Sequence, residues 1–413
     1  MDVREIADEA AWDRCETDWR RITTAPGSRA TVFQGWDWTR AWWRHYGGAS
    51  GRWRRLWVLE FRDGPDVVGY AGLFVSAGFA PLRIARMIGT GGSDYNDLVA
   101  TPGHEARVKD AFWAYLAERR DRWDWLDLQQ VRPDAALLAG NEGDGPAALG
   151  PVRVRHWAGE TCPFLPLPPG DWEAFRKLLG KKMRGNIGYY DRALAKVYEV
   201  EHRLADNDTL ADDLDAFFIL HQRRWNRRWL PGAFAARRAR AFHADVAERL
   251  LASSHLRLHT LSLDGETHAA LYCFQFNNRC AYYLGGFEPT LARLSLGTVL
   301  TARVIRHAIE RDNCSEFDFL RGDEPYKYKW GARDRFNTRL SVTHGGLRGP
   351  ALAVAGRGAL AAELALKRWM HRRHGGGSPS SPAPTSVAPA SVAPAPGAPA
   401  MTPQQQEKET STV

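Results

Sequence analysis

Two stretches of the chain alternate short apolar runs with tight-turn residues and then change to a helical period. In the first stretch, the apolar runs 54–62 and 67–76 flank Asp63-Gly64. Two such runs joined by an Asp-Gly pair predict a β-hairpin. After this hairpin the pattern predicts a strand over 82–88, a Gly-rich segment over 89–94, a helix over 104–119 and a strand over 125–131.

The second stretch repeats this order of elements. Strands are predicted over 256–263 and 268–276, with Asp264-Gly265 as the turn between them. Asn277-Asn278 predicts another tight turn. A strand over 280–285, a helix over 297–311 and a strand over 316–320 follow.

A hairpin followed by a strand-helix-strand crossover gives a mixed sheet with helices on its faces. The repeat therefore predicts an α/β (α+β) fold with two domains, each a mixed twisted sheet with flanking helices. Pro166–Gly170 breaks the chain between the repeats, and Asp171 is placed to cap a helix that begins at Trp172. Further helical patterns cover 181–196, 210–229 and 235–251.

The end of the chain has a different composition. Ala351–His374 predicts a helix with a basic last turn, and 375–413 consists largely of Gly, Ser, Pro, Ala and Thr, which predicts a disordered tail. The predicted parts are an N-terminal domain over 1–160, a C-terminal domain over 161–350, a helix over 351–374 and the tail over 375–413.

Composition agrees with a folded protein of two domains. The 413 residues are too many for one ordinary core, and 44% hydrophobic residues with 17 Trp supply two cores. The net charge of +8 comes partly from clusters such as Arg223-Arg224. Helices often place such clusters on solvated faces, while phosphate contacts and an anionic partner are the alternatives.

The cysteines and the amino end indicate a cytoplasmic protein. Five cysteines, an odd number without any C-x-x-C pair, indicate a reduced compartment. The charged start and the lack of an apolar run of about 18 residues predict neither a signal peptide nor a membrane span. The basic 351–374 helix leaves contact with the inner face of a membrane open beside ordinary packing. No metal is expected, because His371 and His374 lack a Cys or carboxylate partner nearby.

The segment 282–300 runs from a strand through a loop into a helix, and it is the candidate site for an acyl donor. The first N–H groups of a helix lack intrahelical partners and lie at the positive end of its dipole, so they can receive a pyrophosphate. Gly297 would allow close approach, and Ser295 or Thr298 could add a hydroxyl donor. Ordinary helix capping by these two residues is the alternative. The sequence lacks the glycine patterns of P-loop and dinucleotide folds.

Three motifs then occur in order: a gly-phe-x-pro turn at Gly286–Pro289, S-x-G-T at Ser295–Thr298, and D-F-x-x-G-[DE]-x-x-Y-K-x-x-W-G at Asp318–Gly331. This combination resembles the GNAT-related acetyltransferases of the CelD-like group, which are linked to cellulose and exopolysaccharide synthesis and are akin to Fem-type peptidoglycan aminoacyl transferases. The resemblance spans about residues 30–345 and includes the segments 32–47, 93–97 and 181–186.

The resemblance implies two GNAT-like domains with acyl-CoA as co-substrate, bound by the backbone of Ser295, Leu296, Gly297 and Thr298, and a substrate cleft between the halves. Leu296 departs from the Pro that the family often has there. The first half has Thr101–Gly103 where a donor loop would be needed, so one donor site is expected.

In GNAT-like chemistry an amine attacks the thioester directly. Backbone N–H groups of the strand 282–286, opened by Gly285, would polarise the carbonyl; a strand-end bulge is the alternative. Asp323 is a candidate base, although it could equally be an exposed loop acid. Lys327 lies where Fem-type relatives place a lysine, and a salt bridge to Asp323 or Glu324 would also explain it. Tyr326 completes the catalytic candidates.

Asp94 and Tyr95 are assigned to the acceptor pocket, with turn capping by Asp94 as the alternative. Arg224 is a further candidate substrate contact, and His243 is expected in the core rather than the cleft.

The predicted function is acyl-CoA-dependent N-acyl transfer, with acetyl as the expected group, to a small-molecule or sugar-linked acceptor. The alternatives are aminoacyl-tRNA-dependent transfer and a non-catalytic polysaccharide-assembly factor. No nucleic acid other than tRNA in that alternative is expected, and no obligate partner is evident.

Overall fold

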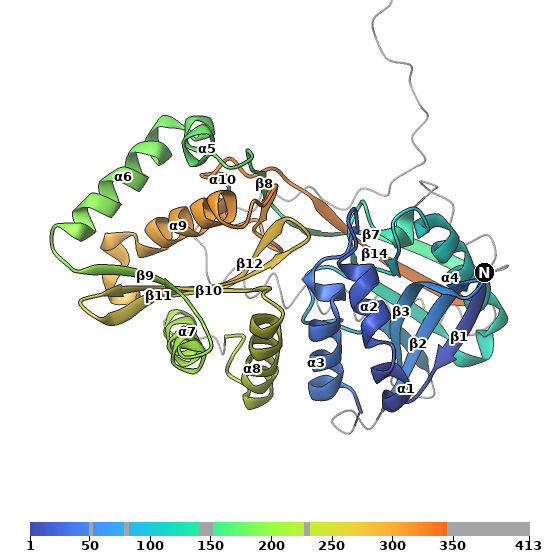
Figure 1. The fold of residues 1–413 in the computed structure, drawn as a ribbon. Helices are drawn as coiled ribbons and strands as arrows, with labels where there is room; N and C mark the ends of the chain where they lie inside the picture. Colours follow the sequence, from blue (N-terminus) through green and yellow to red (C-terminus); the bar gives the residue numbers. More distant parts are fainter. Residues whose placement is uncertain (49–52, 78–81, 140–151, 227–231, 345–413) are drawn as a thin grey trace, which may run out of the picture. The chain divides into compact units, whose positions relative to one another are not determined.

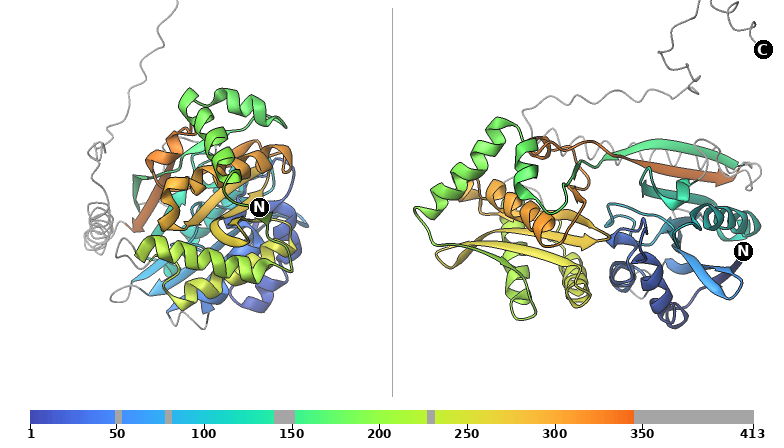
Figure 2. Two further views of the ribbon diagram at one scale, coloured as in Figure 1. Left: turned by 90° about the vertical axis from the view of Figure 1, so that its left-hand side faces the viewer. Right: turned by 45° about the horizontal axis from the view of Figure 1, so that its top comes forward.

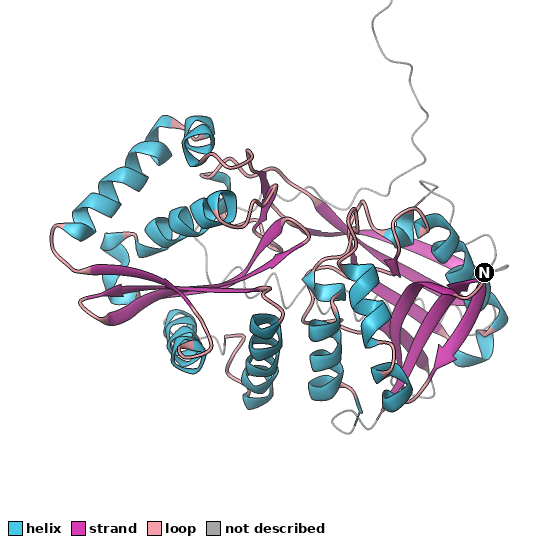
Figure 3. Cartoon of the chain, in the orientation of Figure 1, coloured by secondary structure: helices cyan, strands magenta, loops and turns pink. Residues whose placement is uncertain are grey.

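The computed structural model describes residues 1–48, 53–77, 82–139, 152–226 and 232–344. Within these residues the chain forms two mixed sheets with helices on their faces (Figures 1 and 3). The predicted α/β (α+β) fold is thereby confirmed. The predicted helix over 351–374 and the predicted tail over 375–413 lie outside the described residues.

The first sheet is antiparallel except at one place, where β4 and β6 run parallel. This exception is the crossover that the sequence predicted. In spatial order the strands are β1 (Asp2–Ile6), β2 (Arg54–Asp63), β3 (Asp66–Ala77), β4 (Arg83–Met87), β6 (Trp125–Val131), β14 (Phe336–His344) and β7 (Val152–Thr161), with β5 (Val99–Ala100) paired to β3.

Helices cover both faces of the first sheet. Helix α4 (Glu105–Glu118) buries Val108, Phe112 and Leu116 on one face. The opposite face is covered by tryptophans from α1 (Glu9–Asp13), α2 (Glu16–Thr23) and α3 (Trp36–Tyr46).

The second sheet has the same layered arrangement. Its order is β8 (Phe164–Pro166), β13 (Glu316–Asp318), β12 (Arg279–Phe287), β11 (Glu266–Phe276), β10 (Leu256–Leu263) and β9 (Val200–Leu204). Helices α7 (Leu210–Asn226) and α8 (Arg237–Ala252) lie on one face. Helix α9 (Leu296–Glu310) lies on the other and is overlaid by α5 (Trp172–Leu178) and α6 (Lys181–Ala195), as Figures 1 and 2 show.

Local sequence signals explain several boundaries. Asp171 caps α5 by accepting a hydrogen bond from the Ala174 N–H at 3.0 Å, as predicted. Asn277 and Asn278 both have left-handed φ angles, as a type I′ hairpin turn requires. The short remaining helices are η1 (Val32–Gln34), η3 (Arg120–Arg122), η4 (Ala136–Leu138), η6 (Pro289–Leu294) and α10 (Pro325–Tyr328).

One hydrophobic cluster contains residues from both halves. The ring of Trp38 on α3 lies 5.2 Å from that of Phe242 on α8 and 5.8 Å from that of Phe274 on β11, measured between centroids. Its indole N–H donates to Ser93 Oγ at 2.9 Å. The two halves of the described chain are therefore packed through a shared aromatic core.

Strand β14 follows the second sheet in the chain but belongs to the first sheet. It pairs with β6 and β7, with Phe336 opposite Thr161 and Thr343 opposite Trp125. The range 161–350, which the sequence assigned to the second domain, thus contains a strand of the first sheet. The domain boundaries stay a prediction.

None of the described helices is both long enough and apolar enough to cross a membrane.

Gly286 marks the closest approach of α7 to β12. A Cβ atom added there would lie 2.6 Å from the His221 backbone nitrogen and 2.9 Å from Leu220 Cβ. We expect Gly286→Ala to lower the free energy of unfolding by about 1–3 kcal/mol, because the helix must shift to admit the methyl group. Urea unfolding of the purified chain measures this.

The matched control is Gly185→Ala, whose added Cβ meets no atom within 4 Å on helix α6. Alanine favours a helix over glycine, so this change should stabilise the protein by up to about 1 kcal/mol. Equal stabilities of the two variants would contradict the close packing of α7 on β12.

Candidate active site

Strands β12 and β13 run parallel but pair over three residues only, from Arg279 opposite Glu316 to Ala281 opposite Asp318. Beyond that point the chain after β13 turns towards β8 and the end of β7. The Phe319 N–H donates to the Pro163 carbonyl and the Gly322 N–H to the Thr161 carbonyl, both at 2.9 Å. The rest of β12 has no parallel strand beside it in the described structure, so one edge of its backbone is open.

A β-bulge interrupts β12 at the start of this open edge. Tyr282 lies opposite Cys273 and Leu284 opposite Tyr272, which leaves Tyr283 as the extra residue. The Tyr283 hydroxyl donates to the Gly92 carbonyl of the first half at 2.8 Å. Burial raises the pKa of Tyr283. The bulge that the sequence left open as an alternative is present, two residues before Gly285.

Gly285 is needed for packing within the sheet. A Cβ atom at this position would collide with the Tyr282 hydroxyl and lie 2.9 Å from Leu271 Cδ2. Gly297 also has a packing role, because its Cβ would lie 3.3 Å from the ring of Phe287. The close approach that the sequence attributed to an anion at Gly297 is thus made by the Phe287 ring, and the space beside Gly285 is filled by Tyr282 and Leu271.

The amino end of α9 lies in the loop that follows β12. Ser295 precedes the helix with a left-handed φ of 54°, and its side chain makes no capping hydrogen bond. Its carbonyl accepts from the N–H groups of Thr298 at 2.8 Å and Val299 at 3.2 Å. The first turn contains no acidic residue, and the Leu296 side chain is buried in the core. An anion at this end would meet the helix dipole without a competing carboxylate.

The corresponding helix of the first half, α4, differs at its amino end. Glu105 lies in its first turn, and its carboxylate accepts from the Gly103 N–H at 2.8 Å. The Glu105 carboxylate thus binds the N–H of Gly103, two residues before the helix begins. The expectation of one donor site, in the second half, stays a prediction.

Lys327 closes the loop after β13. Its ammonium donates to the carbonyls of Leu320, Arg321 and Gly322 at 3.3, 3.0 and 2.9 Å and forms an ion pair with Glu324 at 2.9 Å. A lysine ammonium has three N–H donors, so these acceptors engage all of its hydrogen-bond donors. The salt bridge that the sequence allowed is formed with Glu324.

The other two catalytic candidates lie apart from this ammonium. Asp323 is exposed, and it forms no ion pair within the described residues. Tyr326 is half-buried, with its ring centroid 6.1 Å from that of Phe319. The structure thus places the three candidates in one loop, in which Lys327 is buried, Tyr326 half-buried and Asp323 exposed.

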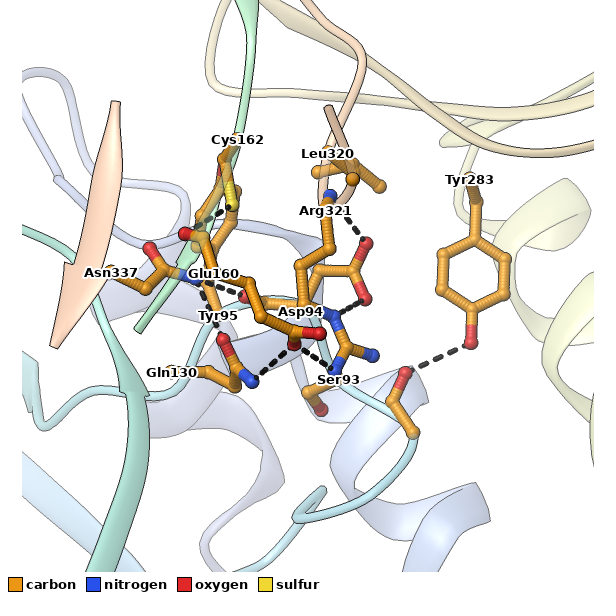
Figure 4. A network of polar contacts seen from close by, with 12 residues as sticks. Ser93, Asp94, Tyr95, Gln130, Glu160, Cys162, Tyr283, Leu320, Arg321 and Asn337 are labelled. Carbon is orange, nitrogen blue, oxygen red and sulfur yellow. Dashed lines mark hydrogen bonds and ion pairs between the residues drawn. The ribbon is translucent and has the colours of Figure 1, made fainter. Parts of the chain in front are cut away.

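Asp94 is bound to a residue of this same loop. Its carboxylate accepts from Arg321 Nε at 2.6 Å and from the Arg321 N–H at 3.3 Å, while Arg321 also donates to Glu160 at 3.1 Å (Figure 4). Burial opposes the charge of Arg321, but the two carboxylates outweigh it and raise the pKa of the guanidinium. Asp94 therefore joins the two halves rather than capping a turn.

Tyr95 makes a second link between the halves. Its hydroxyl donates to Asp318 at 2.7 Å, and Arg335 donates to the same carboxylate at 3.1 Å. Burial raises the pKa of Asp318, and the Arg335 charge opposes this shift. Burial also raises the pKa of Tyr95. In this arrangement the Tyr95 hydroxyl is engaged with protein and does not face an acceptor.

The remaining predicted residues have a plain placement. Arg224 belongs to α7, but its side chain lies outside the described residues. His243 is buried among aromatic rings, as expected. Among the described residues no group of three His, Cys, Asp or Glu side chains could hold a metal ion.

The sequence missed Arg321, Glu160 and Asn337. Asn337 donates to the Asp94 carbonyl at 3.0 Å and to Gln130 Oε1 at 2.9 Å. Arg321 lies inside the Asp318–Gly331 motif, so a charged residue directly after a strand end was an available signal. Glu160 lies on β7 and Asn337 on β14. These strands pair because β14 returns to the first sheet, which no local sequence pattern indicates.

One protein-family model matches part of the second half of the chain. Residues 181–328 match the family model described as an acetyltransferase (GNAT) domain. This part of the chain has a GNAT-type fold. In it β12, α9 and β13 form the strand-helix-strand unit around the open edge. No curated protein matches the chain.

Solved structures resemble the fold over most of the chain. FemX is similar with a TM-score of 0.59 and 10% identity, over 86% of this chain and 99% of that one. A conserved protein of unknown function from Bacteroides thetaiotaomicron VPI-5482 is similar with a TM-score of 0.53 and 12% identity, over 83% and 100%. At these identities the likeness shows the fold alone. Membership of the CelD-like group stays a prediction.

We expect Arg321→Met to lower the free energy of unfolding by about 2–4 kcal/mol, because it leaves the nearly buried Asp94 carboxylate without its partner. Arg223→Met is the control, since Arg223 forms an exposed ion pair with Glu288 at 2.8 Å. Its cost should stay below about 1 kcal/mol. Urea unfolding compares the two variants, and similar costs would show that the Asp94–Arg321 pair does not hold the halves.

His243 gives the stability a pH dependence. Burial lowers its pKa to about 3, and nearby His221 and His45 add to the shift. Below a pH of about 6.5, His243 binds a proton in the unfolded chain but stays neutral in the folded protein. The contribution of His243 to the free energy of unfolding is therefore fully present above this pH and falls as the pH decreases.

Between pH 7 and 5, His243→Phe should reduce this fall by up to about 1.4 kcal/mol per pH unit below the unfolded pKa. Urea unfolding at several pH values measures the slope. The same slope in both proteins would mean that His243 is protonated in the folded state.

Proposed function

We propose that the chain is an acyl-CoA-dependent N-acyltransferase whose donor binds at the amino end of α9 and along the open edge of β12. The observation that carries this proposal is the separation of β12 from β13 after three residue pairs, with α9 beginning in the loop between them. The match of residues 181–328 to an acetyltransferase (GNAT) domain supports it.

In the proposed complex, the backbone N–H groups of Leu296 and Gly297 receive the pyrophosphate, and the hydroxyls of Ser295 and Thr298 add donors beside them, because the N–H groups of Ser295 and Thr298 already donate to backbone carbonyls. The helix dipole and the lack of a first-turn acid favour this anion. The pantetheine arm follows the open edge of β12 past Gly285. N–H groups near the Tyr283 bulge then polarise the thioester carbonyl.

The reaction is a direct transfer. The acceptor ammonium first loses a proton to a base, and the amine then forms a C–N bond with the thioester carbon. The tetrahedral intermediate collapses as the C–S bond breaks, the nitrogen loses its second proton and the thiolate of CoA takes a proton. Asp323 is the proposed base or ammonium ligand, because its carboxylate is exposed and forms no ion pair within the described structure.

Lys327 and Tyr326 act in this proposal by shaping the loop that carries Asp323. Lys327 holds three successive carbonyls, and Tyr326 packs on Phe319. Asp94 and Tyr95 support the first-half side of the proposed acceptor pocket from within the protein, by fixing Arg321 and Asp318. The acceptor class, an amino sugar or a polysaccharide or cell-envelope precursor, rests on the motif resemblance.

Substitution of Ser295 tests the donor site. Ser295→Asp places a negative charge where the pyrophosphate is proposed, and Asp is also a good helix cap, so the fold should persist. We expect CoA to bind about 10- to 100-fold more weakly, because the two like charges repel. Isothermal titration with CoA measures the affinity.

Ser295→Asn is the matched control, because Asn has nearly the shape of Asp, carries no charge and tolerates the left-handed φ of this position. It should bind CoA as the unchanged protein does. Equal affinity of the Asp and Asn variants would sink the pyrophosphate assignment.

The Fem-type alternative predicts a different donor. The likeness to FemX and the net charge of +8 are the observations in its favour. A charged tRNA that binds while CoA does not would replace our proposal by aminoacyl transfer. CoA binding without transfer to any amine would favour a non-catalytic factor.

A further inference from the structure

Helices α5 and α6 carry a concentration of positive charge. Residues 172–198 contain seven Lys and Arg against two acids, Glu173 and Asp191. Both acids are used in ion pairs, Glu173 with Arg176 at 2.9 Å and Asp191 with Arg303 of α9 at 2.7 Å. The positive charge that remains is therefore not neutralised by these carboxylates.

The remaining cations form what we call the basic stripe: Lys177, Lys181, Lys182, Arg192 and Lys196. All five side chains are exposed, and none forms an ion pair among the described residues. The stripe consists of four lysines and one arginine.

Four cations of the stripe lie on α6 or directly after it, and Lys177 lies on α5. Lys181, Tyr189, Arg192 and Lys196 are separated by multiples of three or four residues, so they share a helix face. The opposite face buries Met183, Ile187 and Leu194 against the core that includes α9. Figures 1 and 2 show α6 as the layer over α9, which leaves its other side uncovered by the described chain.

Large apolar side chains next to these cations in the sequence are also exposed. Leu178 next to Lys177 is 73% exposed, Val197 next to Lys196 is 69% exposed, and Tyr189 within the stripe is 63% exposed. Exposed apolar side chains are unfavourable in water, and their burial against a partner surface would lower the free energy of the complex. Whatever covers this face must therefore accept both cations and aliphatic groups.

We propose that this face of α5 and α6 docks on an anionic lipid surface. Lysine ammonium groups reach phosphates of the headgroup layer, while Leu178, Tyr189 and Val197 enter the boundary of headgroups and acyl chains. A nucleic acid fits less well, because a phosphate backbone gives aliphatic side chains no apolar environment and the stripe offers one aromatic ring for stacking. The docking needs no catalytic residue and is independent of the proposed transfer reaction.

Sedimentation of the full chain with lipid vesicles tests the proposal. We expect binding to vesicles of phosphatidylcholine with about one third phosphatidylglycerol, little binding to phosphatidylcholine alone, and weakening of the bound fraction by salt. The variant Lys181→Gln/Lys182→Gln/Lys196→Gln should lower the partition coefficient about 100-fold, because each lysine near an anionic surface contributes to the attraction.

The matched control, Arg14→Gln/Arg55→Gln/Arg153→Gln, removes the same charge from exposed positions of the first half that form no ion pair within the described chain. It should bind the anionic vesicles as the unchanged protein does. A second variant, Leu178→Ser/Val197→Ser, should weaken binding even at high salt, because it removes the apolar part of the contact.

Three results would overturn the proposal. In the first, the protein binds neutral and anionic vesicles equally. In the second, the two charge variants lose vesicle binding to the same extent. In the third, the protein does not bind vesicles but binds polyuridylate, and the triple lysine variant loses that binding. Circular dichroism and CoA titration of each variant separate a docking defect from misfolding or loss of the donor site.

Discussion

The backbone of β12 loses its parallel neighbour after Ala281, and unpaired backbone groups inside a protein must find other partners. The departing chain is fixed by contacts that replace the missing pairs. The Phe319 and Gly322 N–H groups bond to 161–163, and the Lys327 ammonium gathers three carbonyls. The separation of the two strands is therefore stabilised by hydrogen bonds of the chain that follows β13, while the edge of β12 beyond Ala281 has no neighbouring strand in the described structure.

Support for this separation comes from the first half of the chain. Arg321 leaves the end of β13 and is held by Asp94 and Glu160, while Asp318 receives Tyr95 and Arg335. A charged residue of the second half is thus neutralised by carboxylates of the first. In the described structure, residues of the first half thus hold the loop that follows β13 in the second half.

Periodic patterns predicted the elements well, because both hairpins, both crossover helices and their strands depend on local residues. Asp171 and Asn277-Asn278 mark boundaries by side-chain and turn chemistry that needs no tertiary context. The return of β14 to the first sheet could not be predicted in this way, because the residue pattern of a strand does not indicate which of two sheets it joins. Of the site, the helix start at Ser295 and the loop around Lys327 were found from motifs. The pairing of Asp94 with Arg321 was not found, because residues so far apart in sequence meet only through the fold.

The position of β14 has a consequence for synthesis of the chain. Thr161 at the end of β7 and Phe336 at the start of β14 are paired, so residues 162–335 leave and re-enter the first sheet at one point, like a domain inserted into a host. During translation β6 emerges long before β14, and its edge stays open until the entire insert has left the ribosome. A truncated product that ends before Phe336 would therefore expose that edge to other chains.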